Sequence, residues 1–282
     1  MGQLNFSILQ YEFMHNALLA GCLGGVACSL IGVLVVTMGL SFIGVAIAHA
    51  AFAGALFGTF MGFSPEVGAF AFSLAAVATI GPLADRGELN TDIPIGIVFS
   101  LTMGLAFLFM GIMPGPKTDA LELLWGSILT ITRSDLALLF VVALIIVLLI
   151  ALFFKEIQAV IFHREVALAV GLPANFIFYA LLILTGSAIT VSLGSIGGLL
   201  IFNLILNPAA AAYQLTYSLR NMFILSALFG VLSSWIGLML SYMFHFPSGA
   251  SIVLVSTLIF IAAAVFSPKR RVKKWRGASI KI

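Results

Sequence analysis

Charge is the property that this sequence has least of. Only 8% of its 282 residues are Asp, Glu, Lys or Arg, whereas 62% are hydrophobic and the mean hydropathy is +1.22. A soluble globular domain carries about 25% charged residues, so this chain has too little polar surface to cover itself in water. Three long stretches, 16–65, 166–219 and 221–268, contain no charged residue at all. These absences exclude a soluble enzyme.

Motifs that would identify an enzyme or a nucleotide-binding protein are also missing. The sequence has no GxxxxGKS or GxxxxGKT loop for ATP and no HExxH zinc-protease motif. The stretch His163–Glu165 comes nearest to the second motif but lacks its second histidine. The stretch Gly194–Gly197 has the outline of a serine-protease turn, but it has no charged partner within the apolar stretches. We therefore expect no catalytic residue and no bound cofactor in this chain.

The apolar stretches have the length of membrane-spanning helices. A helix crosses the hydrocarbon layer in about 20 apolar residues, whereas barrel strands carry polar residues at every second position. We therefore predict one all-helical membrane domain over 1–282, with about nine spans at 16–38, 41–62, 67–83, 94–113, 135–154, 176–193, 197–213, 222–244 and 250–267. The seventh opens at Gly197-Gly198 and contains Pro208, which predicts a short or broken helix.

The basic residues fall mainly on one side of this predicted topology. Lys117 and Arg133 lie on one side, and eleven others lie on the side of the C-terminus: Arg86, Lys155, Arg164, Arg220, Lys269, Arg270, Arg271, Lys273, Lys274, Arg276 and Lys281. Because Lys and Arg concentrate in cytoplasmic loops, we predict an outside N-terminus and a cytoplasmic C-terminus. The basic tail 268–282 and the pI of about 9.0 then indicate contact with membrane lipid, not with nucleic acid.

Small residues recur along the first two predicted spans. Every fourth position of the second span is small, at Ala50, Gly54, Gly58 and Gly62. Such a stripe predicts close packing of helices. Cys22 and Cys28 lie six residues apart on the first span, about 9 Å along a helix, which is too far for a disulfide. We interpret both cysteines as packing residues.

A short helix is predicted in the charged segment at about 163–173. Glu165 stands near its start, where the helix dipole favours an acid, while Gly171 can cap its end and Pro173 prevents continuation. A helix of one or two turns is marginal in water and needs another surface to hold it in shape. From the residues alone, an ordinary connector and a docking element for a partner both remain open.

His49 is the one histidine that falls inside a predicted span. In hydrocarbon, a ring with two hydrogen-bonding nitrogens must find partners or face an aqueous cavity. Neutral imidazole is also the commonest ligand of transition metals in proteins. On the residues alone, a packing role and a metal-binding role for His49 both stay open.

At these segments the chain resembles the permease subunits of bacterial zinc, manganese and iron ABC importers. The matching stretches are Met38–Ala50 (MGLSFIGVAIAHA), Ile95–Ser100 (IGIVFS), Glu165–Pro173 (EVALAVGLP), Gly197–Ala212 (GGLLIFNLILNPAAAA) and Pro247–Leu254 (PSGASIVL). The resemblance implies a type II importer-like permease in the cytoplasmic (inner) membrane of a bacterium or archaeon. Its implied partners are a cytoplasmic ABC ATPase that uses the ATP, an extracytoplasmic substrate-binding protein, and a second permease copy or a paralogue.

The resemblance also assigns roles to individual residues. The stretch 163–173 would be the coupling helix, with the ATPase contact at Arg164, Glu165, Ala169 and Gly171. In its second span the family has Gly-Asp-Ala-x-Ser-His-Ala, which sets an aspartate and a histidine on one helix face. Here Val45 and Ala48 replace the aspartate and the serine, while His49 is kept.

We therefore predict a translocation pathway with four residues and a single metal ligand. The ligand is His49, and the pathway residues are Val45, His49, Asn203 and Asn207. The two asparagines stand at positions that are small or apolar in the family, and their side chains could supply neutral oxygen. Without an acid at position 45, the desolvation of a divalent ion is offset less well.

The expected function is import of a divalent transition metal, namely zinc, manganese or iron, by ATP-driven alternating access. The missing acid leaves one alternative open, a permease for a metal chelate or another small solute on the same scaffold. A second alternative of a different class is a proton-coupled secondary transporter, which would need no ATPase. The spans carry no chain of acidic residues that could relay protons, which weighs against the second alternative.

Overall fold

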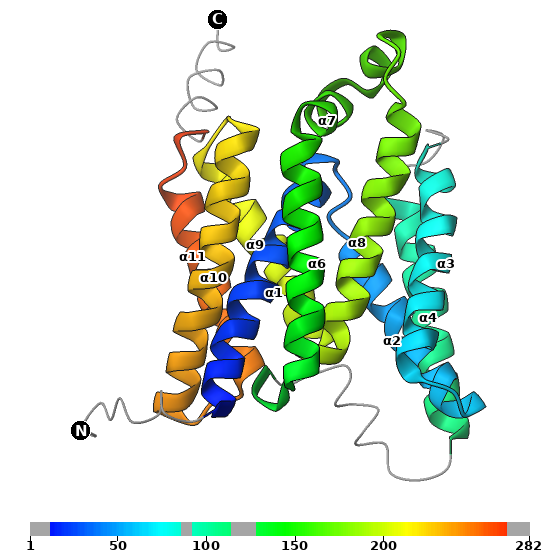
Figure 1. Cartoon of the computed structure of the whole chain (residues 1–282), viewed down its shortest axis with the longest axis vertical. Coiled ribbons are helices and arrows are strands. Elements are labelled where there is room, and N and C mark those ends of the chain that lie inside the picture. Colours follow the sequence, from blue (N-terminus) through cyan, green and yellow to red (C-terminus); the bar gives the residue numbers. More distant parts are fainter. Residues whose placement is uncertain (1–11, 86–91, 114–127, 270–282) are drawn as a thin grey trace, which may run out of the picture.

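The computed structural model describes residues 12–85, 92–113 and 128–269, which form helices joined by turns (Figure 1). In chain order they are α1 (Glu12–Thr37), α2 (Ile43–Met61), α3 (Pro65–Asp85), α4 (Asp92–Ile112), the 3-10 turn η2 (Ile128–Thr130), α6 (Arg133–Leu152), α7 (Phe154–Ala169), α8 (Ala174–Ile196), α9 (Gly198–Leu215), α10 (Leu219–Phe244) and α11 (Ser248–Val265). No strand occurs within these described ranges. The predicted all-helical class is confirmed.

Each predicted span falls on one of these helices. Eight helices are long and apolar enough to cross a membrane, namely α1 to α4, α6, α8, α10 and α11. The ninth predicted span falls on α9, which is apolar over Leu200–Leu215. The helix has 18 residues, as many as α11, and it runs unbroken through Pro208, so the predicted short or broken helix is wrong. A proline removes only one backbone hydrogen bond, and the alanines that follow Pro208 favour continuation of the helix.

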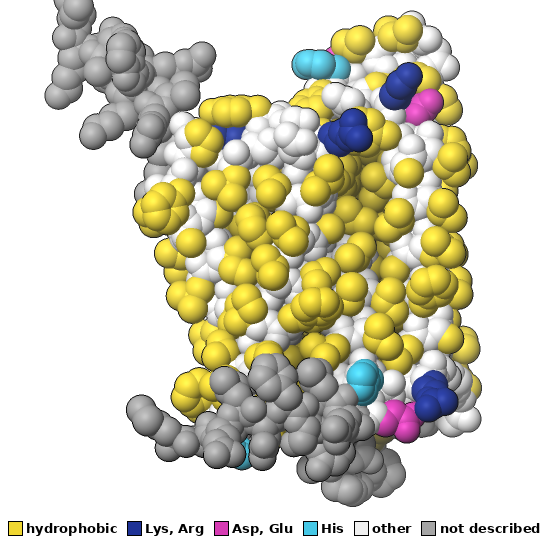
Figure 2. Space-filling model, turned by 60° about the vertical axis from the view of Figure 1, so that its left-hand side comes forward, with side chains coloured by type: hydrophobic (Ala, Val, Ile, Leu, Met, Phe, Trp, Pro, Cys, Tyr) yellow, Lys and Arg dark blue, Asp and Glu magenta, His cyan; other side chains and the backbone are white. Residues whose placement is uncertain are grey.

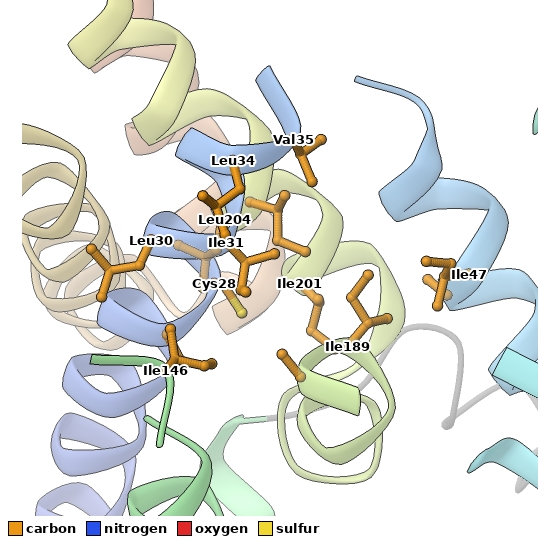
Figure 3. Packing of buried hydrophobic residues seen from close by; sticks show 14 of the residues in the cluster. Cys28, Leu30, Ile31, Leu34, Val35, Ile47, Ile146, Ile189, Ile201 and Leu204 are labelled. Carbon is orange, nitrogen blue, oxygen red and sulfur yellow. The ribbon is translucent and has the colours of Figure 1, made fainter. Parts of the chain in front are cut away.

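The core of the bundle is built around α1. The middle of α1 is almost completely buried, and the helix packs against α6, α8, α9 and α10. Figure 3 shows side chains of several helices meeting there, among them Ile31 of α1, Ile146 of α6, Ile189 of α8 and Ile201 of α9. A helix that is surrounded by other helices needs no polar face. The burial of α1 is therefore consistent with its apolar sequence.

The helices approach one another closely at small residues. A Cβ atom on Gly32 of α1 would overlap the carbonyl oxygen of Ile205 in α9, and one on Gly54 of α2 would overlap that of Gly68 in α3. The small-residue stripe predicted for α2 therefore packs tightly at Gly54, as expected. Gly62 has a different function, because its φ of 79° ends α2 in the left-handed conformation.

The bundle is apolar along its sides and charged near its two ends. Figure 2 shows hydrophobic side chains over the flank and charged side chains gathered at the ends. The start of α1 and the end of α11 lie at opposite ends of the bundle (Figure 1). At the α1 end, Arg133 pairs with Glu12 at 2.6 Å. Chain order puts the other described basic residues at the α7 end: Lys155, Arg164, Arg220 and Lys269. Which end faces the cytoplasm stays a prediction.

Helix α7 consists of two segments that join at His163. This residue has φ −151° and ψ 77°, which lies outside the helical region, so a short helix begins at Arg164 and ends at Ala169. The sequence does not predict the first segment, 154–162, as a separate helix, because its apolar residues continue the pattern of the span before it. The short helix itself lies within the predicted range 163–173.

The short helix ends in a cap that the sequence predicts. Gly171 has a φ of 88°, in the left-handed region that favours glycine. Its N–H donates to the carbonyl oxygen of Leu168, and the N–H of Leu172 donates to that of Ala167, both at 3.0 Å. These two hydrogen bonds form a Schellman motif, which satisfies carbonyls that the helix end would otherwise leave unpaired. The capping role of Gly171 is confirmed.

Candidate functional site

Helix α2 has one half-exposed stripe in an otherwise buried middle. From Ile43 to Gly58 every residue is buried except Val45, His49 and Phe57, which are half-buried. Val45 and His49 lie one turn apart and therefore share a face, as the four-residue spacing predicts. The two predicted pathway residues of α2 are thus the accessible ones at this level of the helix.

The imidazole of His49 is held in place but chemically unsatisfied. Its ring packs edge-on against Phe99 of α4, with the ring centroids 5.0 Å apart. Its Nδ1 atom is buried and has no hydrogen-bond partner in the described part of the chain. Because an unpaired buried polar atom is costly, this nitrogen requires a partner from water, cargo or another chain. The metal-ligand role of His49 stays a prediction.

Asn203 and Asn207 lie one turn apart on α9. They are hydrogen-bonded to each other, and Asn207 also bonds to α11. The Nδ2 amide of Asn207 donates to Oδ1 of Asn203 at 2.7 Å and to the hydroxyl of Thr257 in α11 at 3.0 Å. Within the described ranges, Nδ2 of Asn203 and Oγ of Ser256 are buried without a partner. Oδ1 of Asn203 has a second lone pair, so it can accept from Asn207 and still offer oxygen to a cation.

His49 and the asparagine pair occupy different seams of the bundle. Helix α2 meets α9 at Gly44, where Phe202 and Ile205 lie nearest. His49 instead packs against α4, and Asn207 bonds to α11. The residues that the structure describes contain no group of three His, Cys, Asp or Glu side chains that could hold a metal ion. In the described part of the chain, His49 and the asparagine pair therefore lie apart and do not form one metal site together.

The inner face of the short helix 164–169 is anchored on α8. Ala167 is buried in a small apolar cluster with Ala174, the first residue of α8. Arg164, one turn earlier on the same face, donates from Nη2 to Oδ1 of Asn175 at 2.7 Å. Its Cζ atom lies 4.4 Å from the centroid of the Phe178 ring. Arg164 is thus directed toward its own chain.

The outer face of the same helix is open. Glu165 and Ala169 are exposed, as is Gly171 just beyond the helix end. Val166 and Val170 are 58% and 75% exposed, so this small surface is largely apolar. Three of the four residues predicted to contact an ATPase are accessible there. The contact itself stays a prediction.

Three groups that complete these sites cannot be found from the sequence pattern. Phe99 lies inside the matching stretch Ile95–Ser100, but nothing in that stretch pairs it with His49. Thr257 and Asn175 lie in stretches without any polar pattern. Each becomes visible only when the fold brings its helix against the predicted residue.

The described part of the predicted basic tail ends at Lys269. The Nζ atom of Lys269 lies 3.7 Å from the ring centroid of Tyr213 and 4.9 Å from that of Tyr217, near the end of α9. Burial lowers the pKa of the Lys269 ammonium. These cation–π contacts hold the start of the tail on the bundle. The rest of the tail, with its predicted lipid contact, lies outside the described residues.

Comparison with known proteins gives consistent matches over nearly the whole chain. The ABC 3 transport family matches residues 10–267. The manganese transport system membrane protein MntC of Listeria monocytogenes is 35% identical over 263 residues, which cover 93% of this chain and 94% of that protein. The manganese import system permease protein ScaB of Streptococcus gordonii is 32% identical over 264 residues, or 94% of this chain and 95% of that protein. In the solved structure of PsaBC from Streptococcus pneumoniae in complex with Fab, one chain matches with a TM-score of 0.84 and 31% identity, covering 96% of this chain and 97% of that chain.

Proposed function

The chain belongs to the ABC 3 transport family, and on that premise we propose that it imports manganese. It is the permease of a metal ABC importer, and ATP hydrolysis belongs to a separate ATPase subunit. The observation that supports manganese is the similarity to MntC and ScaB, at 35% and 32% identity over nearly the whole length. The secondary-transporter alternative is not retained, because the family is one of ABC transporters. Uptake of radiolabelled manganese, zinc and iron, each alone, by the reconstituted complex tests the choice of metal.

The proposed pathway runs along the half-exposed face of α2. An imidazole that is half-exposed inside hydrocarbon is unfavourable, so this face must border an aqueous cavity or another protein surface. One chain supplies one wall, and a second copy or a paralogue supplies the opposite wall. An extracytoplasmic binding protein delivers the ion, and ATP-driven closure of the ATPases switches the cavity from outward-facing to inward-facing.

The chemistry of this face suits passage rather than storage of an ion. His49 offers one neutral nitrogen ligand, and Val45 on the same face adds no charge. A divalent ion therefore keeps much of its water and is held weakly. Asn203 and Asn207 offer neutral oxygen, and oxygen ligands suit manganese.

His49→Ala should lower manganese uptake at least about tenfold, the scale of loss seen when supporting groups of a metal site are removed. The amount of the His49→Ala permease in the membrane should not change, because the substitution removes only one edge-on ring contact, the one with Phe99. Val45→Asp should hold manganese more tightly, measured as ion retained by the purified variant. Uptake and melting temperature are measured on the same reconstituted preparation.

The matched control for this prediction is His15→Ala, because His15 is an exposed histidine at the start of α1. That substitution should leave uptake unchanged. If His49→Ala lowers only the melting temperature and leaves uptake per folded molecule intact, His49 is a packing residue and the ligand assignment is wrong.

The predicted orientation can be tested at two exposed positions near opposite ends of the bundle. Gln158→Cys in α7 should react with a membrane-impermeant thiol reagent only from the cytoplasmic side, and Ser134→Cys in α6 only from outside. Cys22 and Cys28 are first replaced by serine and alanine to remove the background. Labelling of both new cysteines from the same side would contradict the proposed topology.

A second candidate cargo is a metal chelate, favoured by the apolar Val45 in place of the family's aspartate. A chelate carries its own ligands and therefore needs no carboxylate in the pathway. The two candidates are separated by measuring uptake of manganese with and without an excess of a small chelator. Uptake that requires the chelator favours the second candidate.

A further inference from the structure

Arg164 is fixed in both position and orientation by two residues of α8. A guanidinium can donate a charge-assisted hydrogen bond in its plane while stacking its face on an aromatic ring. Arg164 donates to Asn175, and its Cζ atom lies over the ring of Phe178. Asn175 and Phe178 lie within the first turns of α8. The short helix is therefore clamped to the end of α8 nearest to it.

The connection of the short helix toward α6 is weaker. At His163 the backbone leaves the helical conformation, so the short helix is not continuous with the first segment of α7. Ala167 and Ala174 share one buried cluster with Val160 of the first segment, and on its other side the capped turn at Gly171 leads directly into α8. A displacement of the outer face therefore reaches α8 through the capped turn and the contacts of Arg164, whereas toward α6 the helical backbone is broken and the apolar contact at Val160 remains.

Helix α8 is in turn connected to the helices that carry the pathway. The hydroxyl of Thr190 donates to the hydroxyl of Ser73 in α3 at 2.7 Å, and both side chains are buried. Helix α3 then packs closely on α2 where Gly68 meets Gly54. The short helix, α8, α3 and α2 are thus joined by a series of packed contacts, through which a displacement can reach the helix that carries His49.

We propose that Arg164 is a positioning residue for the coupling of ATP hydrolysis to transport. It clamps the short helix to α8, so that movement of a docked ATPase is passed to α8 instead of being absorbed at the break at His163. In this assignment Arg164 faces α8, whereas Glu165 and Ala169 face the ATPase. The inference depends on the proposed function, because it requires an ATPase on the outer face.

The test compares transport with ATP hydrolysis in the full complex of permease, ATPase and binding protein in proteoliposomes. Arg164→Lys keeps the positive charge but loses the planar fork and the stacking surface. ATPase association and ATP turnover should stay within about twofold of the unmodified complex, while manganese imported per ATP hydrolysed should fall about tenfold, as expected when a two-state linkage is loosened. Asn175→Ala should lower the same ratio.

Two further variants separate coupling from general damage. Lys155→Gln removes an exposed basic residue from the first segment of α7 and should leave the ratio unchanged. Arg164→Lys combined with Asn175→Asp creates an ion pair across the same contact and should restore most of the ratio. Recovery of this kind is not expected from a residue that merely supports folding.

Two results would overturn the proposal. One is loss of ATPase association in Arg164→Lys with an unchanged ratio in the complexes that still form, which makes Arg164 an ATPase contact. The other is an unchanged ratio in both Arg164→Lys and Asn175→Ala. Manganese import by the unmodified permease without any ATPase would instead contradict the proposed function.

Discussion

Ala169→Trp should abolish ATP-driven manganese uptake while the permease stays folded. Ala169 is exposed on the outer face of the short helix, between Val166 and Val170, so an indole there fills space that a close partner needs. We expect the dissociation constant for the ATPase to rise at least about 100-fold, which corresponds to about 2.7 kcal/mol. Titration of the ATPase onto the permease in lipid discs measures this change directly.

The control for this variant is Phe176→Trp, which introduces the same indole near the same end of the bundle. Phe176 is 73% exposed and belongs to α8, where it lines a pocket with Leu149 of α6 and Tyr179. Its replacement should leave ATPase binding unchanged. Stimulated ATP turnover at the unmodified level in Ala169→Trp would remove the outer face from the proposed ATPase interface.

Gly32→Val should prevent α1 from packing against α9. A Cβ atom at this position already overlaps the carbonyl oxygen of Ile205, which is backbone and cannot rotate away as a side chain could. Overpacking of a core typically costs about 1–3 kcal/mol, and backbone overlap lies at the upper end of that range. The melting temperature of the purified permease should therefore fall by roughly 6–12 °C.

The matched substitution for Gly32 is Gly104→Val on α4. A Cβ atom on Gly104 meets no atom within 4 Å, so the same added side chain costs no overlap there. The melting temperature of that variant should stay close to that of the unmodified protein. If both valine variants melt alike, the close contact of α1 with α9 does not limit stability.

The helical class and the order of the spans could be predicted from the sequence because hydrocarbon leaves the backbone few alternatives. Every backbone N–H and C=O must bond inside the chain, so a long apolar stretch becomes a helix whatever surrounds it. The cap at Gly171 is equally local, because glycine tolerates the left-handed conformation that ends a helix. The break of α7 at His163 has no comparable local signal.

The candidate pathway could be predicted only in part. Helical periodicity alone places Val45 and His49 on one face. The edge-on contact of His49 with Phe99 joins α2 to α4, and the bond from Asn207 to Thr257 joins residues 50 positions apart. The sequence names the polar residues that need partners, but the partners depend on which helices become neighbours.

Arg164 and Glu165 show the same division most clearly. Adjacent in sequence on one short helix, both are candidates for an ATPase contact, and periodicity places them on different faces without saying which face is covered. Tertiary structure decided it, because Ala167 packs against Ala174 and Arg164 against Asn175 and Phe178, leaving Glu165 exposed. By itself the sequence determined the helices, their apolar faces and their caps, since these depend on neighbours along the chain. Only the packed bundle decided which face of each helix is buried, because burial is a contact between segments that the chain brings together from a distance.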